Sequence, residues 1–166
     1  KSDNLRCAGS AITSLLANHL DRYPSREAYY DTKWKLVQAT GGPVVLNEKG
    51  GDLKSYAAQH PSGSVRLVSE SSSPLPDNVF LRSRLIGTHN HDNLAVAAAL
   101  ARALKWPDGY LEGMIAFRGL PHRLQDAGNY GGVQFINDSK ATAIESVLTA
   151  VKAITGASSS RGRVWV

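Results

Sequence analysis

The stretch Val133-Gln134-Phe135-Ile136-Asn137-Asp138-Ser139-Lys140-Ala141-Thr142 passes from an apolar run into a polar string. Apolar residues then recur at helical spacing over residues 144–154. A polar corner between a strand and a helix is typical of parallel α/β proteins, in which loops at strand ends and helix N-termini face one crevice. At this corner Asp138 offers an acceptor for a ribose hydroxyl or a cation, and Lys140 offers a positive charge that suits phosphate.

Upstream of this corner, the sequence predicts alternating strands and helices. The expected strands cover residues 11–16 and 44–46, and the expected helices cover residues 26–39, 52–59, 89–105 and 110–116. Ser25 is the expected N-cap of the first helix, and Asn90 could cap the third. Residues 65–68 and 79–85 alternate apolar and polar side chains, which favours two strands of a small antiparallel appendage.

The chain is expected to contain parts of two domains. A boundary near residues 116–119 would divide residues 1–117 from residues 118–166. The second part is expected to form a βαβ unit, with strands at residues 133–136 and 163–166 around a helix. The fold class is therefore α/β: a parallel-sheet domain with a small antiparallel appendage, then the start of a Rossmann-like domain. Because the sequence stops on a strand, we expect an internal fragment of a longer protein.

Composition excludes several classes of protein. Hydrophobic residues make up 42% and charged residues 20% of the chain, which is typical of folded globular proteins. No apolar run approaches the roughly 20 residues that span a bilayer, so no membrane partner is expected. The net charge of +5 is spread along the chain, and its densest spot, residues 161–163, contains no aromatic residue, which disfavours a nucleic-acid partner. The single Cys7 fits a reducing cytosol.

A first candidate site is the string His19-Leu20-Asp21-Arg22-Tyr23, with Lys33 further along. A histidine and a carboxylate in one loop could bind a cation. A loop histidine that is satisfied by ordinary hydrogen bonds is, however, the commoner outcome.

A second candidate is the string Gly87-Thr88-His89-Asn90-His91-Asp92-Asn93, at the start of an alanine-rich helix. Read structurally, it is a helix N-terminus with a capping asparagine. Read functionally, Asn90 and Asn93 could present their amides to the edge of a purine. A zinc site at His89 and His91 is disfavoured, because no third ligand follows at suitable spacing.

The third candidate pairs the opening corner with Gly119-Leu120-Pro121-His122-Arg123. Each string is weak alone, since Arg123 could be any surface arginine and Asp138 could cap the next helix. Both strings, in this order and around an expected strand, form a more specific signal.

Together these strings resemble motifs of the Mur ligase family, the ATP-dependent amide-forming enzymes of peptidoglycan synthesis. The first string is similar to the family's Asp-His-Leu-Asp-Arg-His/Tyr segment, and the second to its Gly-x-His-Asn-x-x-Asn motif. The resemblance runs from residue 11 to residue 166 in the family's order. No Gly-x-x-x-x-Gly-Lys-Ser/Thr phosphate loop occurs in these residues, so the resemblance implies an ATP-binding central domain whose loop lies outside the chain.

The resemblance implies a role for each matching residue. His19 and Lys33, the latter as a carbamate, would bind a second magnesium ion, because a carbamate supplies the oxygen ligand that a hard dication requires. Asn90 and Asn93 would contact adenine.

On the far side of the expected boundary, Arg123 and Asp138 would contact the ribose side of the nucleotide. Lys140 and Thr142 would serve the reacting carboxylate and the incoming amino acid. The implied catalytic residues are Lys140, His19 and Lys33.

The implied reaction is ATP-driven addition of D-glutamate to UDP-N-acetylmuramoyl-L-alanine through an acyl phosphate. The implied cofactors are ATP, two Mg²⁺ ions and a lysine carbamate at Lys33. The resemblance also implies a monomeric cytoplasmic enzyme of cell wall biogenesis, which bears on cell shape and division. Without a phosphate loop, the isolated 166 residues are expected to be inactive.

Three departures from the family's pattern keep alternatives open. Asn18 stands where the family has an acidic residue, Ala143 where it has asparagine, and residues 47–50 read Asn-Glu-Lys-Gly where Asn-x-Asp-Asp is typical. A ligase that adds L-glutamate and a non-catalytic homologue that binds nucleotide are the two alternatives.

Overall fold

The computed structural model describes residues 6–17, 22–142, 144–157 and 162–166, and it contains a three-stranded parallel sheet. The strands β1 (Ser10–Ile12), β2 (Val44–Asn47) and β3 (Val65–Val68) pair in that order. Val44 lies opposite both Ser10 and Val65 in the register. The strand expected at residues 11–16 is thus shorter and begins one residue earlier.

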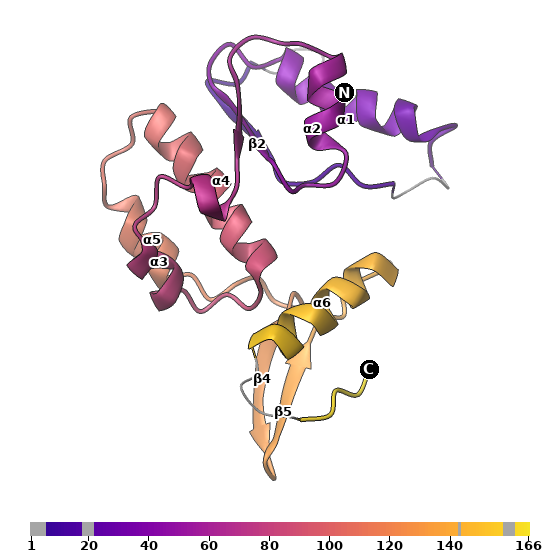
Figure 1. Cartoon of the computed structure of the whole chain (residues 1–166), viewed down its shortest axis with the longest axis vertical. Helices are drawn as coiled ribbons and strands as arrows, with labels where there is room; N and C mark the ends of the chain where they lie inside the picture. The colour runs from indigo at the N-terminus through magenta and orange to yellow at the C-terminus, as the bar shows by residue number, and fades with distance from the viewer. Residues whose placement is uncertain (1–5, 18–21, 143, 158–161) are drawn as a thin grey trace.

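Helices cover both faces of this sheet (Figure 1). The helices α1 (Arg26–Gln38) and α2 (Leu53–Gln59) lie on one face, where they pack against Val44 and Leu46. The helices α3 (Asp77–Arg82), α4 (Thr88–Ala103) and α5 (Tyr110–Ala116) lie on the other, in the cluster that contains Val45 and Val68. Alternate side chains of β2 therefore enter opposite halves of the core, as the pleat requires.

Local signals explain where α1 begins and which side it buries. The Ser25 hydroxyl oxygen accepts a hydrogen bond from the Ala28 N–H at 3.1 Å, which confirms the predicted N-cap. The buried residues of the helix are Tyr29, Tyr30, Trp34 and Val37. Their spacing gives one apolar face, which packs on the sheet.

The antiparallel appendage expected over residues 65–85 is wrong. β3 pairs in parallel with β2, and residues 77–82 form α3 instead of a strand. Pro76 and Asp77 favour a helix start, and the adjacent Val79 and Phe80 are both buried, which a strand with one solvent face does not allow.

The small antiparallel sheet lies instead in the second part of the chain. β4 (Gln125–Tyr130) and β5 (Val133–Asn137) form a hairpin whose turn residues, Gly131 and Gly132, have φ of +59° and +80°. Two positive φ values suit a two-residue hairpin turn, and glycine adopts them without strain.

The helix α6 (Ile144–Ala157) follows the hairpin. Residues 162–166 have no regular secondary structure, so the strand expected at residues 163–166 is wrong and a Rossmann-like unit is not confirmed. Within the described parts of the chain, no helix is both long and apolar enough to cross a membrane.

Candidate functional site

Polar side chains gather where the parallel strands end. Asn47 is the last residue of β2 and is 6% exposed, and its amide nitrogen donates to the Thr13 carbonyl at 3.1 Å. Its amide oxygen accepts a hydrogen bond from the Lys49 N–H at 3.0 Å. Because the carboxyl ends of parallel strands form the ligand-facing edge of an open α/β sheet, this edge is the candidate site.

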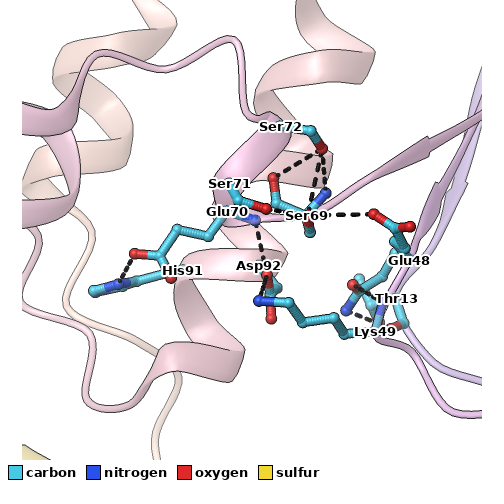
Figure 2. Close-up of polar contacts among 10 residues, drawn as sticks. Thr13, Glu48, Lys49, Ser69, Glu70, Ser71, Ser72, His91 and Asp92 are labelled. Carbon is cyan, nitrogen blue, oxygen red and sulfur yellow. Dashed lines mark hydrogen bonds and ion pairs between the residues drawn. The ribbon is translucent and has the colours of Figure 1, made fainter.

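The first turns of α4 are fastened to this edge (Figure 2). The buried Asp92 accepts a hydrogen bond from the Glu70 N–H at 2.8 Å, and the same oxygen lies 3.5 Å from Lys49 Nζ. The neighbouring His91 Nδ1 lies 2.9 Å from Glu70 Oε1. Lys49 follows β2 and Glu70 follows β3, so these contacts join the helix to the ends of two strands.

The two asparagines of the second string lie side by side on α4. The Asn90 amide nitrogen donates to the Ile86 carbonyl at 2.8 Å, and the Asn93 amide nitrogen donates to the Asn90 amide oxygen at 3.4 Å. Asn90 is not the N-cap, because that position is occupied by Gly87. The capping role proposed for Asn90 is therefore wrong, and its amide belongs to a pair of half-buried amides.

The structure brings the strings around residues 119–123 and 137–142 together. The Asp138 carboxylate accepts a hydrogen bond from the Leu124 N–H at 3.0 Å, and the Lys140 N–H donates to the His122 carbonyl at 3.2 Å. Arg123, Lys140 and Thr142 are exposed to solvent. This corner thus presents a half-buried carboxylate beside exposed cationic and hydroxyl groups.

The start of α4 lies against α6, the helix that follows the corner in the chain. Gly87, with φ of +92°, approaches α6 so closely that a methyl group there would lie 2.5 Å from the Ala153 Cβ. Burial lowers the pKa of His89 below its usual 6.5, while the nearby carboxylates of Asp138 and Asp92 oppose that shift. His89 therefore lies in the field of a residue from each side of this contact.

Lys33 lies apart from these groups, on α1 near the end of β1. Its Nζ donates to the Ser14 carbonyl at 3.3 Å and lies 4.8 Å from the centroid of the Tyr29 ring. It lines a cavity of about 770 Å³ between β1 and α1, together with Arg6 and Lys35.

Of the two residues expected to bind a metal ion, His19 and Lys33, the structure describes only Lys33. His19 and Asn18 lie outside the described residues, as does Ala143. Among the residues that are described, no group of three or more histidine, cysteine or acidic side chains could hold a metal ion. The Ser14 carbonyl beside Lys33 is an oxygen donor that suits Mg²⁺, whereas the Lys33 amine fits such an ion only once it is converted to a carbamate.

Sequence reasoning missed the contacts of Lys49, Glu70 and Asp92 at the sheet edge. Lys49 and Glu70 each come two residues after the end of a parallel strand, which is the signal that could have singled them out.

An α/β protein with a polar site at the carboxyl edge of a parallel sheet is the class that this fold and site define. Curated proteins named UDP-N-acetylmuramoylalanine--D-glutamate ligase are similar to most of the chain. The protein from Myxococcus xanthus is 33% identical over 176 residues, which cover 91% of this chain and 39% of that protein. Those from Leptospira borgpetersenii and Aquifex aeolicus are 33% and 31% identical, covering 87% and 86% of this chain.

These similarities show that the chain belongs to the Mur ligase family. The chain spans between 35% and 39% of the length of these relatives. No protein-family model matches the chain.

Proposed function

We propose that this chain is part of an ATP-dependent ligase that adds D-glutamate to UDP-N-acetylmuramoyl-L-alanine, releasing ADP and phosphate. One observation supports this most: His89, which directly precedes Asn90 of the amide pair, lies in the electrostatic field of Asp138, and Gly87 at the start of the same helix touches α6, the helix that follows Asp138 in the chain. Amides suit the edge of an adenine, and a carboxylate suits ribose hydroxyls. One nucleotide could therefore bridge the two elements.

In this proposal, residues 1–117 are the latter part of the central ATPase domain and residues 118–166 begin the C-terminal domain. The nucleotide lies between them, with Asn90 and Asn93 on adenine and with Arg123 and Asp138 on the ribose side. Closure of the two domains then excludes water and completes the site.

The chemistry follows from the poor reactivity of a carboxylate. Transfer of the γ-phosphoryl group to the L-alanine carboxylate gives an acyl phosphate, and the D-glutamate amine then attacks its carbonyl carbon, expelling phosphate. Lys140 stabilises the negative charge on the phosphoryl or acyl oxygen, and Thr142 orients D-glutamate. Both roles are positioning and electrostatics, which dominate catalysis of phosphoryl transfer.

His19 and a carbamate on Lys33 would hold one of two Mg²⁺ ions. Bound there, Mg²⁺ would neutralise negative charge on the γ-phosphate. Lys33 already points to the carbonyl of Ser14, an uncharged oxygen that suits the same ion.

The cellular part of the proposal is a monomeric enzyme of the cytoplasm, where it supplies a peptidoglycan precursor for cell wall growth. Its partners are the UDP-sugar and D-glutamate, with neither nucleic acid nor membrane among them.

The test is phosphate release by the complete natural polypeptide that carries this sequence, with ATP, Mg²⁺, the UDP-sugar and either D- or L-glutamate. We expect D-glutamate-dependent release that falls at least about a hundredfold in Lys33→Ala and in Asp138→Ala. Lys35→Ala on the same helix and Asp126→Ala in the hairpin are the matched controls, and both should retain activity.

Phosphate release with L-glutamate but not with D-glutamate would show that the protein is the alternative ligase, which adds L-glutamate. ATP binding without release would favour the non-catalytic homologue. The isolated 166 residues should release no phosphate, and D-glutamate-dependent release from them would refute the need for a phosphate loop elsewhere.

A further inference from the structure

The ion pair of Lys49 and Asp92 joins two segments that are distant in the sequence. Asp92 is 5% exposed, whereas the Lys49 side chain is 56% exposed. A carboxylate buried to this degree needs compensating donors. Among the described residues, the Glu70 N–H at 2.8 Å and Lys49 Nζ at 3.5 Å supply them, both on the same oxygen. At residues 47–50, where the sequence departs from the family's pattern, the departing lysine therefore has a specific partner.

Glu70 is held at two points by consecutive residues of α4 (Figure 2). Its N–H donates to Asp92, and its carboxylate lies 2.9 Å from His91 Nδ1. Glu70 begins the short 3₁₀ turn Glu70–Ser72, which a reciprocal capping arrangement between Ser69 and Ser72 closes. These hydrogen bonds hold the turn in one conformation, and the contacts of Glu70 with His91 and Asp92 hold α4 against it.

Helical geometry links this fastening to the amide pair. Successive residues of an α-helix are about 100° apart around its axis, so residues three apart are about 60° apart. Asn90 and Asn93 therefore share one side of α4, and His91 and Asp92 point to the other sides of the helix. Holding His91 and Asp92 fixes how the helix is rotated and, with it, where the two amides point.

We propose that Lys49 and Asp92 are positioning residues for recognition of the nucleotide base. By fastening the start of α4 to the ends of β2 and β3, they aim the amides of Asn90 and Asn93 at the base edge. The inference rests on the proposed function, in which those amides contact adenine. A site that reads hydrogen-bonding groups on a ligand discriminates strongly only when its own groups are correctly aimed.

The experiment compares Asp92→Asn and Lys49→Met in the complete natural polypeptide, with ATP and GTP as alternative nucleotides. Asparagine keeps an oxygen to accept the Glu70 N–H but loses the charge that pairs with Lys49. We expect the preference for ATP over GTP in kcat/KM to fall about tenfold in each variant, mainly through a higher KM for ATP. Lys49→Arg, which keeps the charge, should retain the preference.

Lys54→Met is the matched control, because the 2.9 Å ion pair of Lys54 in the same region is with Glu48, whereas the cation paired with Asp92 is Lys49. It should leave the nucleotide preference unchanged. The half-exposed Lys49 makes Lys49→Met a safe second variant if Asp92→Asn folds poorly.

An unchanged ATP-to-GTP ratio in Lys49→Met, with or without a lower melting temperature, would overturn this inference and leave the proposed function standing. Failure of the unaltered protein to bind ATP would instead overturn the proposed function, and this inference with it.

Discussion

The parallel-sheet region and the hairpin region bury their apolar side chains to very different degrees. In the sheet, Val45 and Leu46 are 0% exposed, because helices cover both faces. In the second region, Phe135 of β5 is 50% exposed and Leu148 of α6 is 53% exposed. The hairpin also projects away from the sheet (Figure 1). Two parts of one chain thus carry parts of one candidate site on scaffolds of unequal rigidity.

The difference concerns function as well as stability. Asn90 and Asn93 lie on a helix packed against a buried core, whereas Asp138 and Lys140 lie on a segment with few buried contacts. Segments with few buried apolar contacts open at lower free energy than core elements do. The proposed amide pair therefore lies on the more deeply packed element, and the proposed corner residues lie on a segment that should open at lower free energy.

The largest expected effect comes from truncating one leucine in each region. Leu46→Ala should cost about 2–5 kcal/mol of unfolding free energy, because it leaves a cavity between β2 and the helices on its face. Leu148→Ala should cost no more than about 0.5 kcal/mol, since its side chain is half exposed. Urea denaturation of both variants measures the two losses of unfolding free energy. Equal losses would contradict the difference in packing between the two regions.

A smaller effect is expected from removing a tyrosine hydroxyl. Tyr30 donates to Asp52 Oδ2 at 2.7 Å and so ties α1 to the start of α2. Tyr30→Phe should cost about 1 kcal/mol, while Tyr130→Phe, in the exposed hairpin, should cost almost nothing. Thermal unfolding of the two variants, side by side, is the measurement.

The same tyrosine gives the sheet region a signature at high pH. Burial, helped by Asp52, raises the pKa of Tyr30 to about 12 from its usual 10. Between these values the unfolded chain loses the proton first, so stability should fall as pH rises above 10. Tyr30→Phe should remove the part of this loss of stability that comes from Tyr30. An identical dependence of stability on pH in the variant would contradict the assignment.

The smallest effect concerns His89, where the two regions meet. Because burial lowers its pKa below 6.5, the unfolded chain takes up the proton first as the pH falls. Stability should therefore decline as the pH drops through 6.5 and level off below the folded-state pKa. His89→Gln should flatten this decline, whereas His122→Gln in the corner should leave it in place. Denaturation midpoints measured between pH 5 and pH 8 decide between the two outcomes.

Features set by nearby residues could be predicted from the sequence. Ser25 capped its helix as expected, and residues 110–116 form α5 with the expected bounds. The helix at residues 77–82 was missed because alternation in residues 79–85 resembles a strand, although Pro76 and Asp77 start a helix. β4 was missed because its residues are mostly polar and show no apolar alternation. It is a strand because it pairs with β5.

In the candidate site, too, features set by nearby residues could be predicted and contacts between distant residues could not. The sequence analysis grouped the strings around Arg123 and Asp138 into one candidate site, and the structure joins these strings through the Leu124 N–H and the Asp138 carboxylate. The pairing of Lys49 with Asp92 could not be predicted, because it depends on how the sheet places α4 beside β2. Contacts between residues 43 positions apart follow from packing rather than from any local pattern.

The contact between Gly87 and Ala153 determines how closely the start of α4 can approach α6. Asn90 comes three residues after this glycine, and α6 begins six residues after Asp138. Any side chain at position 87 would wedge the two elements apart and would also face an unfavourable backbone angle. The closest approach of the start of α4 to α6 is therefore set by two of the smallest residues in the chain, neither of which has a polar side chain.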